Sequence, residues 1–232
     1  MPDPPPADFD EYAGQYAELL EDPIRARFAP GGSFFVQRKL ILLLSQLRRL
    51  GFDAKSMSWL DVGCGQGELL RLGRDEFSET AGTDPSSLML ASCLDLSVRL
   101  QRASARIPYG DGRFDVVSLV CVYHHVVATD RPGLTSEAVR VLKPGGVLVV
   151  IEHNPFNPLT RLIVSRTPID EDARLLSACK VRRLLRKAGM RSLMTRYFLY
   201  LPERQYARFA RFEDYLSRIP LGGQYAVFGR KI

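Results

Sequence analysis

The sequence predicts an α/β fold in which a mostly parallel sheet is covered by helices on both faces. Strand-like and helix-like segments alternate from residue 57 to residue 152, which is the pattern of successive βαβ units. Two of these segments, Phe114–Val122 and Val147–Glu152, are largely apolar, as strands buried on both faces are. The glycine-rich turn Gly63–Gly67 follows the first predicted strand, at the place where α/β folds bind ligands.

The pattern of the first 50 residues predicts helices and no strands. Phe9–Leu20 has the pattern of a short helix that carries Tyr12 and Tyr16, and a longer helix is expected at Phe34–Leu50, stopped by Gly51. We therefore expect a helical cap at residues 1–52 in front of a core at 53–232. Tyr12 and Tyr16 either close over a ligand or are the aromatic residues of an amphipathic helix.

The core reads as seven strands and five helices, with one interruption. At residues 153–176 several prolines break the alternation, which predicts a lid-like excursion, and Lys143–Gly146 is expected to be a turn. The predicted strands are Met57–Val62, Thr80–Thr83, Arg99–Ser104, Phe114–Val122, Val147–Glu152, Arg191–Tyr200 and Gln224–Lys231. The predicted helices are Gly67–Arg74, Ser86–Leu96, Thr135–Leu142, Ser177–Ala188 and Pro202–Arg218.

Composition excludes several classes of protein. The chain has 232 residues, 46% hydrophobic and 25% charged, which fits one globular domain. The longest apolar run, Leu40–Leu44, is too short to span a membrane, and the acidic, proline-rich start lacks the features of a secretory signal. The four cysteines, Cys64, Cys93, Cys121 and Cys179, lack metal-ligand spacing. We therefore expect a cytoplasmic protein with reduced thiols, no bound metal and no membrane span.

The most informative turn is the glycine-rich one. The sequence WLDVGCGQGEL at residues 59–69 places Gly63, Gly65 and Gly67 between a strand and a helix. Glycines let the backbone approach a ligand closely, and the free N–H groups of the helix favour an anionic group. The nicotinamide-dinucleotide pattern G-x-G-x-x-G is the main competitor, but here the third glycine comes one residue early and Asp61 precedes the loop.

Four motifs, in this order and spacing, resemble the class I S-adenosylmethionine-dependent methyltransferases, in the branch of methyltransferase types 11 and 12. They are LDVGCGQG at residues 60–67, GTDPS at 82–86, IPYGDGRFD at 107–115 and VLKPGG at 141–146. The resemblance covers residues 58–151 well. It implies a Rossmann-like, doubly wound sheet of seven strands whose last strand is antiparallel and lies between the fifth and the sixth.

The same resemblance implies a site for S-adenosylmethionine, with S-adenosylhomocysteine as the product. The glycine loop would surround the methionyl part, Asp61 would orient the amino group, and Asp84 would accept hydrogen bonds from the ribose hydroxyls. Relatives usually carry an acid after the third strand that binds adenine; here Ser104 stands in that region instead. A capping or turn role for either acid is the alternative. The residues assigned to the cofactor are Asp61, Gly63, Cys64, Gly65, Gly67, Asp84, Pro85, Ser104 and Val120.

Three histidines, His124, His125 and His153, all lie just past predicted strands. Methylation of an alcohol or phenol requires removal of a proton, and histidine is the usual base near pH 7. Neighbouring strand ends lie about 5 Å apart, so His124 and Glu152 can meet. We predict His124 as the base, oriented by Glu152, with His125 as the second candidate; a packing role for these rings is the alternative.

The acceptor is less defined. We expect O-methylation of a small molecule or of a sugar or glycan hydroxyl; N- or C-methylation of another metabolite is the alternative, and RNA or protein is a weaker one. Residues 161–218 hold 14 Lys and Arg against 6 Asp and Glu, and several of them have helical spacing opposite apolar positions. This pattern predicts solvated helix faces, not a specific nucleic-acid surface. A monomer or a homodimer is expected.

Overall fold

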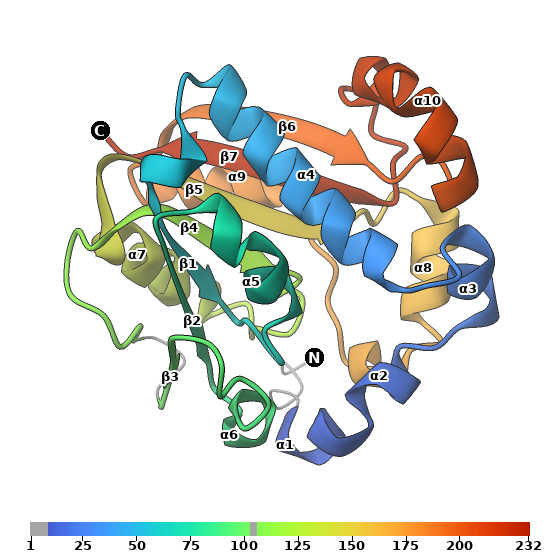
Figure 1. The fold of residues 1–232 in the computed structure, drawn as a ribbon, viewed down its shortest axis with the longest axis horizontal. Helices are drawn as coiled ribbons and strands as arrows, with labels where there is room; N and C mark the ends of the chain where they lie inside the picture. The colour runs from blue at the N-terminus through green and yellow to red at the C-terminus, as the bar shows by residue number, and fades with distance from the viewer. Residues whose placement is uncertain (1–8, 103–105) are drawn as a thin grey trace.

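The computed structural model describes residues 9–102 and 106–232, and its centre is one seven-stranded sheet (Figure 1). The strand order is β3-β2-β1-β4-β5-β7-β6, and β7 runs antiparallel to both of its neighbours. This order confirms the predicted doubly wound sheet and its antiparallel last strand. The strands are β1 (Ser58–Val62), β2 (Glu79–Asp84), β3 (Val98–Leu100), β4 (Phe114–Val120), β5 (Leu142–His153), β6 (Arg191–Phe198) and β7 (Gln224–Arg230).

Helices cover both faces of the sheet (Figure 1). Because side chains alternate along a strand, Trp59 packs into one core with α4 and α5, whereas the next residue, Leu60, packs into a second core with α7 and α9. The central strands are therefore buried on both faces, and their polar side chains gather at the strand ends. The helices are α1 (Phe9–Tyr12), α2 (Tyr16–Leu19), α3 (Pro23–Phe28), α4 (Ser33–Arg49), α5 (Glu68–Gly73), α6 (Ser87–Leu90), α7 (Arg131–Val141), α8 (Pro158–Val164), α9 (Ala178–Lys187) and α10 (Glu203–Leu216).

Several elements differ from the prediction, among them α6, α7 and β5. Helix α6 ends at Leu90, not at residue 96; the Ser86 side chain caps its start, and beyond its end Leu94 is 94% exposed. Helix α7 begins at Arg131 because Pro132 suits the first turn of a helix. The predicted turn at residues 143–146 lies inside β5, where Gly145 has a φ of 78° and the pairing with β4 is irregular.

The N-terminal segment lies across the end of the sheet that carries the glycine loop (Figure 1). The predicted helix at residues 9–20 is divided into α1, a 3₁₀ turn and α2. The Asp10 carboxylate accepts hydrogen bonds from the Ser86 hydroxyl (2.5 Å) and from the Leu88 N–H (3.2 Å), and Gln66 Nε2 donates to the Ala13 carbonyl (2.9 Å). These contacts fix α1 and its turn against α6 and the loop.

The proline-rich excursion at residues 153–176 contains α8 and a 3₁₀ turn, Pro168–Asp170. Asn154 Nδ2 donates to the carbonyls of Pro220 (3.0 Å) and Gly222 (2.8 Å), and Thr160 Oγ1 donates to the Gly223 carbonyl (2.9 Å). The excursion is thus attached to the chain that leads into β7. Among the described helices, none is long and apolar enough to cross a membrane.

Candidate active site

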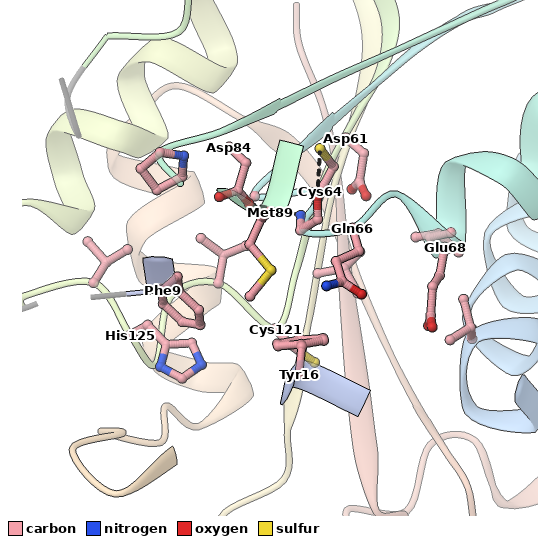
Figure 2. Close-up of a pocket in the computed structure, with 18 of the residues that line it drawn as sticks. Phe9, Tyr16, Asp61, Cys64, Gln66, Glu68, Asp84, Met89, Cys121 and His125 are labelled. Carbon is pink, nitrogen blue, oxygen red and sulfur yellow. Dashed lines mark hydrogen bonds between the residues drawn. The ribbon is translucent and has the colours of Figure 1, made fainter. Parts of the chain in front are cut away.

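Two cavities meet at the carboxyl ends of β1, β4 and β5. One, of about 430 Å³, is lined by the glycine loop and is called the glycine-loop cavity (Figure 2). The other, of about 290 Å³, is lined by His124, His153 and Asp170 and is called the histidine cavity. The residues that line both are Tyr16, Val36, Lys39, Glu68, Cys121 and His125.

The glycine loop presents bare backbone to its cavity. Gly63 has a φ of 74°, and a Cβ there would lie 2.5 Å from a methyl group of Val122, so a larger residue does not fit. Gly65 has a φ of 53°, and a Cβ there would meet nothing within 4 Å. The space over Gly65 is therefore open to a ligand that contacts the backbone directly.

Two buried carboxylates flank this loop. Asp61, at 2% exposed, accepts a hydrogen bond from the Ser118 hydroxyl (2.5 Å), and burial raises the pKa of Asp61 to about 7. Asp84 accepts hydrogen bonds from the backbone N–H groups of Gly65 (2.8 Å) and Ser86 (2.9 Å), and burial raises its pKa as well. Both side chains line the cavity, which suits a ligand with a cationic group and hydroxyl groups.

The structure brings together seven of the nine residues assigned to the cofactor. The residues that line the glycine-loop cavity are Asp61, Gly63, Cys64, Gly65, Asp84, Pro85 and Val120. Gly67 does not line it; this residue precedes α5 in a left-handed conformation, and a Cβ there would lie 2.4 Å from Leu96. Its glycine is thus required for packing behind the loop. Ser104 lies outside the described residues.

The predicted pairing of His124 with Glu152 is present. Nδ1 of His124 lies 2.6 Å from Oε2 of Glu152, whose other oxygen accepts a hydrogen bond from the Tyr123 N–H (2.7 Å). Both side chains are buried, and His124 lines the histidine cavity. The pairing of β4 with β5 produces this contact, because His124 follows the end of β4 and Glu152 lies near the end of the adjacent parallel strand β5.

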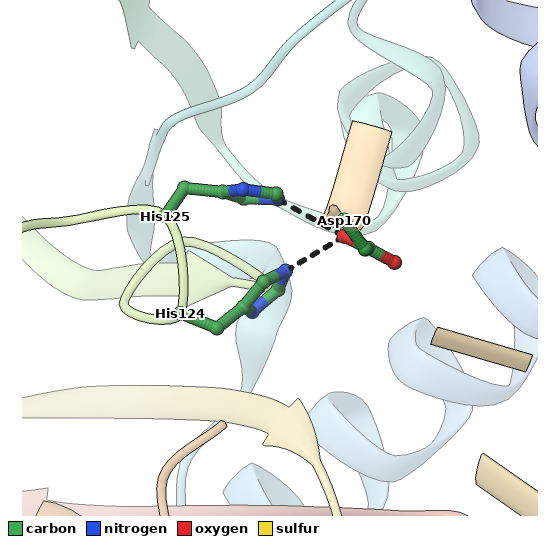
Figure 3. Close-up of side chains that lie close together, drawn as sticks. All are labelled: His124, His125 and Asp170. Carbon is green, nitrogen blue, oxygen red and sulfur yellow. Dashed lines mark ion pairs between the residues drawn. The ribbon is translucent and has the colours of Figure 1, made fainter. Parts of the chain in front are cut away.

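Asp170 is the polar partner that sequence reasoning missed. Its Oδ1 lies 3.4 Å from Nε2 of His124 and 3.3 Å from Nε2 of His125, so that both rings converge on one oxygen (Figure 3). Asp170 belongs to the proline-rich excursion, and no motif or strand end marks it. The signal in the sequence that could have found Asp170 was a carboxylate within the segment expected to form a lid.

Asp170 changes the charge expected at His124. Burial by itself would lower the pKa of His124, but the carboxylates of Glu152 and Asp170 outweigh it and raise the pKa to about 10. Burial and the neighbouring His124 charge lower the pKa of His125 to about 3. The two pKa values shift in opposite directions, so a proton shared by this pair of rings favours His124 over His125. A general base must be neutral before it accepts a proton, and the role of His124 as the base stays a prediction.

Further residues that sequence reasoning did not assign reach the boundary between the cavities. Tyr16 lines both, whereas Tyr12 lines neither. Lys39 extends from α4, with Nζ 3.5 Å from Sγ of Cys121. Burial raises the pKa of Cys121, but the charges of Lys39 and His153 outweigh it and lower the pKa to about 7. Phe9 packs its ring edge-on against His125, with centroids 4.9 Å apart.

Comparisons with known proteins identify a methyltransferase domain in this chain. A family model described as a methyltransferase domain matches residues 60–150. A demethylmenaquinone methyltransferase from Tropheryma whipplei is 35% identical over 100 residues, 41% of this chain and 41% of that protein. A 2-methyl-6-phytyl-1,4-hydroquinone methyltransferase from Synechocystis is 30% identical over 166 residues, 62% of this chain and 52% of that protein. The chain thus spans about half the length of these relatives, or less.

The fold has equally clear relatives among solved structures. A SAM-dependent methyltransferase from Thermotoga maritima superposes with a TM-score of 0.67 at 20% identity, covering 97% of this chain and 98% of that one. The matched domain contains the glycine loop and Asp84, and the sheet has the strand order predicted for the Rossmann-like methyltransferase fold. The chain therefore contains a methyltransferase domain at residues 60–150 and has the Rossmann-like fold of S-adenosylmethionine-dependent methyltransferases.

Proposed function

We propose that the protein transfers the methyl group of S-adenosylmethionine to an acidic hydroxyl oxygen of a small acceptor with an apolar or aromatic body. The observation that carries the proposal is the histidine cavity, which shares a wall with the glycine-loop cavity and combines charged side chains with apolar ones. Nine apolar side chains contribute to its lining: Leu20, Phe28, Phe35, Val36, Leu159, Ile163, Ile169, Leu199 and Leu221.

The glycine-loop cavity fits the cofactor of the family. The open backbone at Gly65 would lie against the methionyl part, the Asp61 carboxylate would bind the amino group, and Asp84 would bind the ribose hydroxyls. S-adenosylmethionine supplies an electrophilic methyl group when it is bound. The protein then contributes mainly the alignment of the acceptor with that methyl group.

Positive charge at the boundary favours an ionised acceptor oxygen. Lys39 lines both cavities, and His124, held by Glu152 and Asp170, lines the histidine cavity. A nearby cation stabilises an oxyanion and lowers the pKa of the hydroxyl that forms it. We therefore assign His124 an electrostatic role toward the acceptor, in place of the neutral base expected from the sequence.

C-methylation is the second candidate. The relatives named above include a hydroquinone methyltransferase, and an ionised phenol also activates the ring carbons beside its oxygen. The apolar walls suit either reaction on an aromatic acceptor.

The test is a reaction with S-adenosylmethionine labelled with ¹³C at the methyl group. Phenols, catechols, hydroquinones, monosaccharides and primary amines are each supplied as the acceptor, and NMR distinguishes a methyl group on oxygen, carbon or nitrogen. We expect label on the oxygen of phenolic acceptors. Label on carbon would support the second candidate, and label only on sugars or amines would contradict the proposal.

A further inference from the structure

We propose that His124, His125 and Asp170 form a binding site for a divalent transition-metal ion in the histidine cavity. The donor atoms are Nε2 of both rings and one carboxylate oxygen, and all three lie within 4.8 Å of one another (Figure 3). The two nitrogen–oxygen distances are 3.4 Å and 3.3 Å. Metal–ligand bonds of about 2.0–2.2 Å place neighbouring ligand atoms about 3–3.5 Å apart, so this spacing suits ligands around one ion.

The groups behind the ligands support the same assignment. A metal-bound histidine usually donates its other ring N–H to a carboxylate, which fixes the ring and makes it a better ligand. Nδ1 of His124 has such a partner in Glu152, at 2.6 Å, and Glu152 is itself held by the Tyr123 N–H. Nε2 is then the atom that faces Asp170, and a metal ion that binds this nitrogen displaces its proton and takes over the positive charge beside Asp170. The edge-on contact with Phe9 restrains the ring of His125.

The donor set indicates the kind of ion. Two imidazoles and one carboxylate are ligands of Mn²⁺, Fe²⁺, Co²⁺ and Zn²⁺, whereas Mg²⁺ and Ca²⁺ prefer oxygen ligands alone. Three protein ligands leave coordination positions free for another molecule, and all three residues line the histidine cavity. An ion there would bind a hydroxyl oxygen of the acceptor and lower its pKa. This use of the ion, unlike the site itself, rests on the proposed function.

The site is tested on the whole protein after treatment with a chelator. Mn²⁺, Co²⁺ and Zn²⁺ are titrated separately by calorimetry, and Co²⁺ binding is also followed by its visible absorption. We expect one equivalent to bind. The Asp170→Asn and His125→Ala variants should bind at least tenfold more weakly, and Glu152→Gln about 10–100-fold more weakly. His153→Ala is the matched control, because this histidine lines the same cavity outside the ligand set; it should bind as the native protein does.

The outcomes separate this proposal from the proposed function. The metal site would be overturned if none of the three ions bound stoichiometrically. Equal weakening of metal binding by His153→Ala and Asp170→Asn would overturn it as well. Binding of S-adenosylmethionine by each variant shows that the fold and the glycine-loop cavity are intact. Methylation without metal binding would contradict the metal site and support the proposed function. Metal binding without methylation of any acceptor would support the metal site and contradict the proposed function.

Discussion

The two cavities differ in how far apart in the chain their residues lie. In the glycine-loop cavity, the groups assigned to the cofactor come from the ends of β1, β2 and β4, within the matched segment 60–150. The histidine cavity draws most of its lining from outside that segment, including α2, α4, α8 and the start of β7. The matched segment thus supplies the residues assigned to the cofactor, whereas the flanking segments supply most of the lining of the histidine cavity.

The cavities also differ in charge. The glycine-loop cavity holds two buried carboxylates, Asp61 and Asp84. In the histidine cavity Asp170 faces His124, whose ring also contacts the buried Glu152, and Arg25 adds a positive charge to the lining. A variant in one cavity should therefore leave the ligand of the other largely unaffected, and the following variants test that separation.

The largest effect is expected at His124. The His124→Ala variant leaves the Glu152 carboxylate buried without its cation, which costs about 3–5 kcal/mol of the free energy of unfolding. Urea denaturation should show the loss, and the double variant His124→Ala/Glu152→Leu should recover part of it. His153→Ala, in the same cavity, should change the free energy of unfolding by less than about 1 kcal/mol. A loss of that small size in His124→Ala would mean that the pair contributes little.

Asp84→Ala should mainly affect the other cavity. Loss of a charge-assisted hydrogen bond to the ribose should weaken S-adenosylmethionine binding by about 1.5–3 kcal/mol, measured by calorimetry. Asp130→Ala is the control, since Asp130 also lines the glycine-loop cavity but lies outside the family motifs. Metal binding by Asp84→Ala should match that of the native protein. Equal losses in both aspartate variants would contradict the ribose assignment.

Cofactor binding should depend on pH through Asp61. Burial raises the pKa of Asp61 to about 7, so below that pH the carboxyl is neutral and binds the cofactor's ammonium group poorly. The affinity for S-adenosylmethionine should rise with pH, by at most about tenfold per unit, and level off above about pH 7. The same shift makes the free protein lose stability as pH rises through 7, because folding then buries a charge. Asp61→Asn should bind weakly with no such slope; a slope retained in this variant would implicate another group.

The smallest effect is expected at Lys39, on the boundary. Lys39→Met should lower turnover of a phenolic acceptor by about tenfold, because one partly exposed positive charge near the oxygen is lost. Lys39→Arg should recover much of the rate. The dissociation constant of S-adenosylmethionine should change by less than about twofold. If Lys39→Met instead weakened the binding of S-adenosylmethionine, Lys39 would be assigned to the glycine-loop cavity.

The sequence by itself determined the sheet and most of the cofactor site. Apolar runs such as Phe114–Val122 identify the buried strands, and the acids Asp61 and Asp84 fall at strand ends. Carboxyl ends of adjacent parallel strands meet at one edge of the sheet, so residues there become neighbours without further information. The contact between His124 and Glu152 was predictable for the same reason.

Only the tertiary structure decided what surrounds that edge. Asp170 reaches His124 from a proline-interrupted connection, and Lys39 and Tyr16 reach the boundary from N-terminal helices. Hydrophobic periodicity indicates which face of a segment is buried, but it does not indicate which distant segment covers that face. The charge of His124 depends on Asp170, and therefore on the path of the connection. Sequence patterns encode local faces and strand ends, whereas the acceptor cavity arises from long-range packing.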